Sequence, residues 1–116
     1  MLKGSQASDI SSTWSSPEFD DSQWLERSAP FWYGDGAGGT ILTDMQNNYS
    51  TLYLRTRFTA TNTERISALH MNVDYDDGFI VWLNGKIILR RNAPVTPSYD
   101  AFAPANHESG SPESFS

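Results

Sequence analysis

The stretch that decides the fold runs from Tyr75 to Arg90 and reads YDDG, FIVWL, NG, KIILR. It places an acidic turn, an apolar run, an Asn-Gly pair and a second apolar run in unbroken order. Asn84 and Gly85 readily adopt the positive φ that both central residues of a type I′ turn require. The sequence therefore predicts a hairpin of two antiparallel strands and an all-β fold. Because the first strand carries apolar side chains on both faces, we expect it to lie centrally or beneath a loop.

Composition and charge limit the classes of function. The 116 residues suit one domain spanning 1–116, and the 13% aromatic content is typical of a folded domain. The net charge of -6 and the few, scattered basic residues argue against nucleic-acid binding, which uses clustered Lys and Arg. Since the chain has no cysteine, the sequence predicts neither disulfides nor thiolate chemistry.

The apolar runs and the two ends of the sequence lead to further predictions. The longest apolar runs have the length of a strand, so we expect no membrane span. No apolar segment follows Met1-Leu2-Lys3, and we expect that any leader peptide of the parent protein is not part of this sequence. The apolar pattern fades after Asn92, and only Ser114-Phe115-Ser116 is typical of a beginning strand. We therefore expect the domain to lack its closing strands beyond about residue 100.

Two further strands and two irregular segments are predicted between these ends. Residues 52–58 and 69–75 alternate apolar with more polar side chains, which is the pattern of a half-buried strand. Residues 34–39 are too rich in glycine for regular structure and predict a loop. Residues 5–16 are rich in serine, with Trp14 as the one large side chain, and we expect them to wrap the domain without entering its core.

The aromatic side chains allow two roles. Trp32, Tyr33 and Trp82 can stack on a sugar, because an aromatic face packs against the apolar face of a pyranose while polar neighbours bind its hydroxyls. Aromatic residues also fill the cores of small β-domains. We expect that core role for Trp14, Trp24 and Phe58. Trp32 and Tyr33 border the glycine-rich loop, and the sequence leaves both roles open for them.

Acidic residues gather in two turns. Asp74, Asp76 and Asp77 stand at the end of a predicted strand, and Asp20 and Asp21 form a second group. Carboxylates can bind Ca²⁺, which takes about six to eight oxygen ligands, but no complete calcium loop is present. We expect turn-forming roles and no cofactor, with a Ca²⁺ site as the alternative. Glycoside hydrolysis needs two carboxyls across a cleft, which neighbours on one turn do not form, so the sequence predicts no catalytic residue and no enzyme.

The remaining polar side chains have open roles. Arg90 and the two residues after it can face solvent, reach a ligand, or pair with Asp76 or Asp77. His70 and His107 lie far apart in the sequence, without the spacing of metal ligands. The sequence therefore predicts no metal site at the histidines.

The order of several motifs resembles a known group of domains. The motifs, in chain order, are Phe19–Trp24, Ala29-Pro30-Phe31 with Tyr33-Gly34, Tyr53–Phe58, Asp76–Gly78 and Trp82–Gly85. Together they look like the galactose-binding-like jelly rolls, which include the sugar-binding domain of family-two glycoside hydrolases and accessory domains of large secreted bacterial proteins. The resemblance covers roughly residues 4–94 of this chain.

What the resemblance implies is a jelly-roll β-sandwich of two antiparallel sheets. Such domains are usually non-catalytic accessory modules of a larger secreted or surface protein, often a glycoside hydrolase, and are often carbohydrate-binding. The implied partners are a polysaccharide or other glycan and the remainder of a multidomain protein. The family normally adds closing strands, including a Leu-x-x-Gly-x-Asn segment, that this sequence does not contain. That departure puts in doubt any site built from those strands.

Two functions follow as expectations. The first is carbohydrate binding, with Trp32, Tyr33 and Asp35 at the rim of the glycine-rich loop. The polar partners of the sugar would be Asp76, Asp77 and Arg90. The alternative is a structural or interaction module, whose open sheet edge pairs with another chain or with the closing C-terminal strands.

Overall fold

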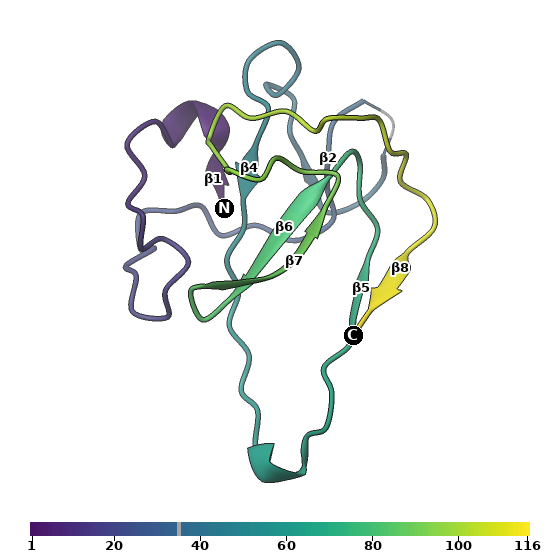
Figure 1. The fold of residues 1–116 in the computed structure, drawn as a ribbon. Helices are drawn as coiled ribbons and strands as arrows, with labels where there is room; N and C mark the ends of the chain where they lie inside the picture. The colour runs from purple at the N-terminus through teal and green to yellow at the C-terminus, as the bar shows by residue number, and fades with distance from the viewer. Residues whose placement is uncertain (35) are drawn as a thin grey trace.

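The computed structural model describes residues 1–34 and 36–116. Within these residues the regular structure is β-strand, apart from two 3-10 turns, η1 (Gly4–Gln6) and η2 (Thr63–Arg65) (Figure 1). The all-β prediction is therefore confirmed. None of the described helical turns has the length or the apolar character needed to cross a membrane. The strands are β1 (Leu2–Lys3), β2 (Phe31–Trp32), β3 (Thr40–Ile41), β4 (Leu52–Tyr53), β5 (Met71–Val73), β6 (Phe79–Leu83), β7 (Lys86–Arg91) and β8 (Glu113–Phe115).

The strands pair as four two-stranded sheets across the described residues. The pairs β1–β4, β5–β8 and β6–β7 are antiparallel, whereas β2 and β3 are parallel. The short parallel pair depends on the glycine-rich loop, because Gly34, Gly38 and Gly39 all have positive φ and let the chain turn fully round. The predicted loop is thus confirmed for Gly34 and residues 36–39, and Asp35 lies outside the described residues. The two-sheet jelly roll stays a prediction.

The hairpin predicted from the Asn-Gly pair is confirmed as β6 and β7. Asn84 has a φ of 49° and Gly85 a φ of 84°, as a type I′ turn requires. The register shifts between Val81 and Trp82, which is the mark of a β-bulge. Every residue of β6 is half-buried, and the ring of Trp82 lies 4.9 Å from the ring of Trp14. Trp14 belongs to the loop that precedes β2, so at Trp82 the strand packs against a loop, which is one of the two positions expected for it.

The other two predicted strands are much shorter than the alternation suggested. β4 ends at Tyr53 and β5 begins at Met71, and between them the chain extends as an arm with η2 at its tip (Figure 1). Leu54 is 48% exposed and Phe58 64% exposed, so the prediction of a core role for Phe58 is wrong. Alternation yields a strand only where a neighbouring strand accepts the backbone hydrogen bonds, and no described strand pairs with residues 54–62.

Few of the described residues are fully buried, and the buried hydrophobic ones lie in the N-terminal half of the chain. Ala7 (0% exposed) and Leu42 (3%) are the buried hydrophobic residues of the described chain. Ala7 follows η1 directly, so the expectation that residues 5–16 stay out of the core is wrong. Leu42 is held by its amide, which donates to the carbonyl of Trp32 over 2.7 Å. Trp14 and Trp24, expected in the core, are half-buried and stack on each other at 6.2 Å.

Candidate ligand-binding site

A pocket of about 270 Å³ lies where four segments distant in sequence meet. Each segment contributes one aromatic side chain to its wall: Trp14, Tyr53, Trp82 and Tyr99. Besides the two tyrosines, the polar residues of the lining are serines: Ser8, Ser11, Ser12 and Ser98. The remaining lining residues are small or apolar: Ala7, Ile10 and Pro97. Such a mixture of aromatic faces and hydroxyl groups suits a neutral ligand with both apolar and hydroxyl surfaces.

The aromatic wall has defined geometry because its rings contact one another edge to face. The ring of Trp14 meets Tyr53 at 5.0 Å with an interplanar angle of 86°, and meets Trp82 at 4.9 Å and 70°. On its other side Trp14 stacks on Trp24, and Trp24 in turn contacts Phe19 at 5.7 Å. Edge-to-face pairs at these distances are favourable beyond the area they bury. They hold the indole of Trp14 in one orientation against the hairpin.

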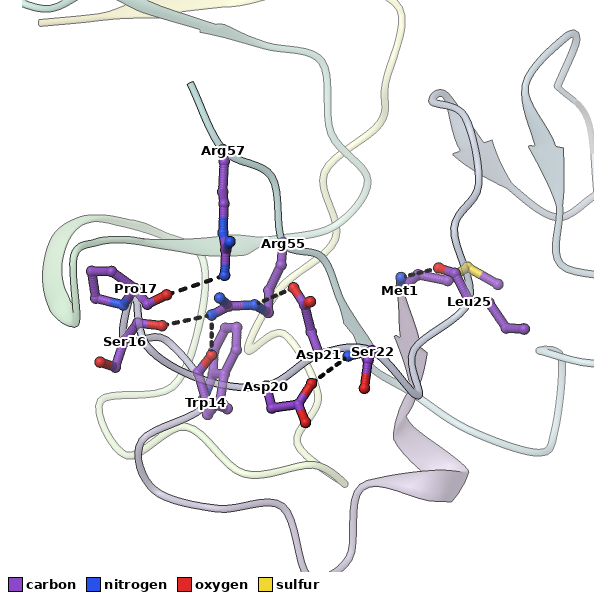
Figure 2. A network of polar contacts seen from close by, with 10 residues as sticks. All are labelled: Met1, Trp14, Ser16, Pro17, Asp20, Asp21, Ser22, Leu25, Arg55 and Arg57. Carbon is purple, nitrogen blue, oxygen red and sulfur yellow. Dashed lines mark hydrogen bonds and ion pairs between the residues drawn. The ribbon is translucent and has the colours of Figure 1, made fainter. Parts of the chain in front are cut away.

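The loop that carries Trp14 is tied to the chain just after β4 by Arg55 (Figure 2). Its Nε donates to Oδ2 of Asp21 over 2.9 Å, and its Nη1 donates to the carbonyl of Trp14 and, over 3.1 Å, to that of Ser16. The side chain is only 11% exposed. Its guanidinium also lies 5.3 Å from the ring centroid of Phe19, which is the range of a cation–π contact. One half-buried cation therefore joins three points of the loop.

The contact with Arg55 lowers the pKa of the Asp21 carboxyl group. The hydrogen bond from Arg55 and the positive charges of Arg55 and Arg57 hold the pKa of Asp21 below its ordinary value of 3.8, against a smaller opposing effect of burial. Asp21 is therefore ionised at neutral pH. Sequence reasoning assigned Asp21 to a turn and missed its partner, because Arg55 lies 34 residues away.

Residues 97–99, which also line the pocket, are attached to the chain just before β4. The hydroxyl of Thr51 donates to the carbonyl of Tyr99, and the amide of Gly4 donates to the carbonyl of Thr51 over 2.9 Å. Burial, and secondly the negative charge of Asp100, raise the pKa of Tyr53. The phenol of Tyr53 therefore keeps its proton at neutral pH and can donate a hydrogen bond to a ligand.

Of the loop-rim residues predicted for sugar binding, the two that the structure describes, Trp32 and Tyr33, lie outside this pocket. The indole Nε1 of Trp32 donates to the carbonyl of Gly38 over 2.7 Å, and a Cβ added at Gly36 would meet the Trp32 ring closer than 3.0 Å. Trp32 thus packs against its own glycine-rich loop. Tyr33 is 47% exposed, and Asp35 lies outside the described residues.

The polar partners predicted for the sugar form a separate group at the end of the hairpin. Asp77 accepts a hydrogen bond from the amide of His107 over 2.8 Å and, through its carbonyl, from Nδ2 of Asn92 over 3.0 Å. Nη2 of Arg90 donates to the carbonyl of Val95 over 3.0 Å. Asp76 belongs to the same turn. The structure therefore brings Asp76 and Asp77 close to His107 of the C-terminal segment, while Arg90 bonds to Val95, and none of the predicted site residues that it describes lines this pocket.

Among the described residues, the acidic side chains do not gather into a set of calcium ligands. Across residues 1–34 and 36–116, no group of three or more His, Cys, Asp or Glu side chains is arranged to hold a metal ion. Asp20 accepts from the amide of Ser22 over 3.0 Å, as turn residues do, and Asp74 accepts from the amide of Gly110 over 2.7 Å. These carboxylates thus have structural partners.

Comparison with known proteins does not assign the chain. No family model, no curated protein and no solved structure matches it. Of the residues that line the pocket, the sequence pointed to Trp82 as a stacking candidate and placed Trp14 in the core. Tyr99 was missed, and the only available signal was an aromatic residue in the polar exit after Pro97.

Proposed function

We propose that the chain is a non-catalytic carbohydrate-binding module of the jelly-roll type, part of a larger secreted or surface protein. The observation that carries the proposal is the pocket walled by Trp14, Trp82 and Tyr99, with serine hydroxyls beside them. A pyranose presents an apolar C–H face that packs on aromatic rings, and hydroxyls at its edge that exchange hydrogen bonds with Ser and Tyr side chains. The resemblance to galactose-binding-like domains supports the same function.

The size and lining of the pocket define the kind of binding. At about 270 Å³ it stands at the small end of ligand pockets, so we assign it to one sugar ring and not to a long chain segment. No carboxylate belongs to its lining, whereas glycoside hydrolysis uses two carboxyls about 5–10 Å apart. The proposal is therefore binding without catalysis, and the small contact area makes the affinity weak.

Replacing Tyr99 distinguishes a binding site in this pocket from one at the rim of the glycine-rich loop. Tyr99 is 37% exposed and Tyr33 47% exposed, so Tyr99→Ala and Tyr33→Ala are matched losses of one partly exposed phenol. We expect isothermal titration against a glycan panel to detect one ligand for the native chain. Tyr99→Ala should weaken its binding by about 5-fold to 150-fold, if stacking on one aromatic side chain contributes about 1–3 kcal/mol as it does for stacked bases. Tyr33→Ala should leave it unchanged.

The outcomes of that titration distinguish three cases. Loss of binding with Tyr33→Ala, and none with Tyr99→Ala, would move the site to the rim of the glycine-rich loop. Heat with none of the glycans, by a chain that unfolds cooperatively, would contradict carbohydrate binding. Equal weakening by both variants would contradict a site confined to the pocket.

A second function is favoured by the exposed apolar side chains of the arm between β4 and β5. Leu54, Phe58, Ile66 and Leu69 are 48%, 64%, 43% and 51% exposed, and Met71, where β5 begins, is 42% exposed. A row of this kind on one extension is typical of a surface that packs against another chain or domain. The second candidate is thus a structural or interaction module, in which the arm supplies the contact surface.

Phe58→Asp tests the arm. We expect the native chain to sediment above its monomer mass of 13.0 kDa at high concentration, and Phe58→Asp to return it to the monomer, because a buried unpaired carboxylate disfavours the contact. Val95→Asp is the control, since Val95 is 81% exposed and lies off the arm. A native chain that remains monomeric at every concentration, or equal dissociation by both variants, would count against self-association through the arm.

A further inference from the structure

The C-terminal strap, residues 105–115, is held against the turn at 74–77 and against β5 by a series of specific contacts (Figure 1). At one end Nδ2 of Asn92 donates to the carbonyl of Ala105 over 2.6 Å. In the middle the amide of Gly110 donates to Asp74. At the other end β8 pairs with β5, and the hydroxyl of Ser114 donates to Oδ1 of Asn72 over 2.5 Å. These contacts dock the strap along its length.

His107 lies at the centre of this docking. Its ring stacks on the ring of Tyr75 with centroids 3.9 Å apart and planes 8° apart. Its Nδ1 is 3.0 Å from the carbonyl oxygen of Tyr75, and its Nε2 is 3.0 Å from Oε1 of Glu113. The side chain is 30% exposed and that of Glu113 is 44% exposed. The imidazole thus joins the turn before β6 to the first residue of β8.

Both ring nitrogens of His107 face oxygens that can only accept hydrogen bonds. A neutral imidazole carries one N–H, so one of its two nitrogens would direct a lone pair at the lone pairs of either the carbonyl or the carboxylate. The imidazolium carries two N–H groups and satisfies both oxygens at once. The geometry of the docked strap therefore matches the protonated ring and not the neutral one.

Most of the groups around the His107 ring raise its pKa. Burial by itself lowers the pKa of His107, but the hydrogen bonds to Glu113 and Tyr75 and the negative charges of Glu113 and Asp76 outweigh it and raise the pKa. The guanidinium of Arg91 lies 4.8 Å from the ring centroid of Phe115, and its positive charge acts on Tyr75. The charged and titratable groups around His107 and the docked strap, from the turn, β7 and β8, are Asp74, Tyr75, Asp76, Asp77, Arg91 and Glu113.

We propose that the strap is a pH-controlled latch, docked when His107 is an imidazolium and released when the ring loses its proton. Release separates β8 from β5 and removes the contact between Phe115 and Phe79, whose rings are 5.8 Å apart when the strap is docked. The edge of β5 and one face of the Phe79 ring then become available to another strand or partner. The latch is independent of the pocket at Trp14 and of any sugar bound there.

The sign of the effect follows from linkage. Because docking raises the pKa of His107 above 6.5, the stabilisation is fully present below that value and is lost as the pH rises through the raised value. For every unit by which docking raises the pKa, the docking equilibrium differs about tenfold between the protonated and neutral rings. The latch therefore opens as the pH rises through the raised pKa of His107, which lies above 6.5.

Nuclear magnetic resonance and amide hydrogen exchange on the full chain test the proposal together. We expect the ring ¹⁵N shifts of His107 to report two protonated nitrogens at about pH 6.5. Between about pH 6 and about pH 8.5, the protection of the amides of residues 113–115 should fall severalfold once the intrinsic pH dependence of exchange is removed, with the same midpoint as the ring. Tryptophan fluorescence that stays constant over this range excludes global unfolding as the cause.

Three variants decide the assignment. His107→Gln should lower the protection of residues 113–115 at acidic pH and abolish its pH dependence, whereas His70→Gln, which removes the other histidine, should change neither. Glu113→Gln should move the midpoint to lower pH, because an amide can donate to a neutral Nε2 and docking no longer needs the charge. A neutral ring at about pH 6.5, or unchanged pH dependence in both His107→Gln and Glu113→Gln, overturns the latch.

Discussion

Gly78→Ala should destabilise the chain by about 2–3 kcal/mol, because it places a methyl group where backbone already lies. A Cβ at residue 78 would stand less than 3.0 Å from the carbonyl oxygens of Arg91 and Asn92. Those atoms belong to the end of β7 and the residue after it, so no side-chain rotation relieves the overlap. The hairpin must therefore open at its base.

The same substitution should also loosen the C-terminal strap. Asn92 bridges the carbonyls of Asp77 and Ala105 through its Nδ2, and displacing its backbone breaks both hydrogen bonds. We expect the protection of the amides of residues 105–115 to fall together with the midpoint of chemical unfolding. Chemical denaturation followed by tryptophan fluorescence measures the first effect, and hydrogen exchange measures the second.

Gly34→Ala is the matched control for this prediction. Gly34 has a φ of +84° and open space around its added Cβ, so alanine there meets only the conformational cost of a left-handed residue, about 1 kcal/mol. The predicted order is therefore a larger loss for Gly78→Ala than for Gly34→Ala. Equal losses would show that close backbone approach at Gly78 does not determine the stability of the hairpin.

Arg55→Ala is the second large effect, with an expected loss of about 2–4 kcal/mol. The guanidinium makes three hydrogen bonds and is 11% exposed, so its removal takes a donor from the Asp21 carboxylate and from the carbonyls of Trp14 and Ser16, of which Ser16 keeps the amide of Phe19. Since those groups belong to the loop that carries Trp14, the aromatic wall of the pocket should loosen as well. Glycan binding should weaken more than the loss of stability alone explains.

A control variant and the pH dependence of stability test this prediction further. Arg57→Ala removes an exposed cation with one hydrogen bond, 3.1 Å long, to the carbonyl of Pro17, and should change stability by less than about 0.5 kcal/mol. Because the pKa of Asp21 is lowered, its ion pair contributes stability above pH 3.8 that is lost as the pH falls through the lowered value. Arg55→Ala should remove that acid-side slope, and a slope that persists in the variant would contradict the assignment.

Local signals in the sequence were sufficient for the turns. Asn84 and Gly85 adopt positive φ because their own backbones tolerate it, so the hairpin was predicted with its strands and turn. The glycine-rich loop was predicted on the same ground. By contrast, the alternation of residues 52–58 predicted a strand that β4 realises only at Leu52–Tyr53, because pairing depends on a neighbour that local pattern does not supply.

The candidate site was less predictable than the turns. The sequence indicated aromatic stacking, with Trp82 among the candidates, but it placed the site at Trp32, Tyr33 and Asp35 with Asp76, Asp77 and Arg90 as polar partners. The pocket instead brings Trp14 and Trp82 together with Tyr99, whose positions in the chain are far apart. No periodicity or motif reports a meeting of such distant segments.

What the sequence alone determined is the β-character of the chain and the conformations of its turns, since these depend on the steric limits of single residues and adjacent pairs. Tertiary structure decided which side chains share a site. Arg55 reaches back to the loop of Trp14, and His107 meets Tyr75 and Glu113, because hydrogen bonds and ring contacts form between whatever groups the packed backbone brings within a few ångströms. Those contacts define the pocket and the latch.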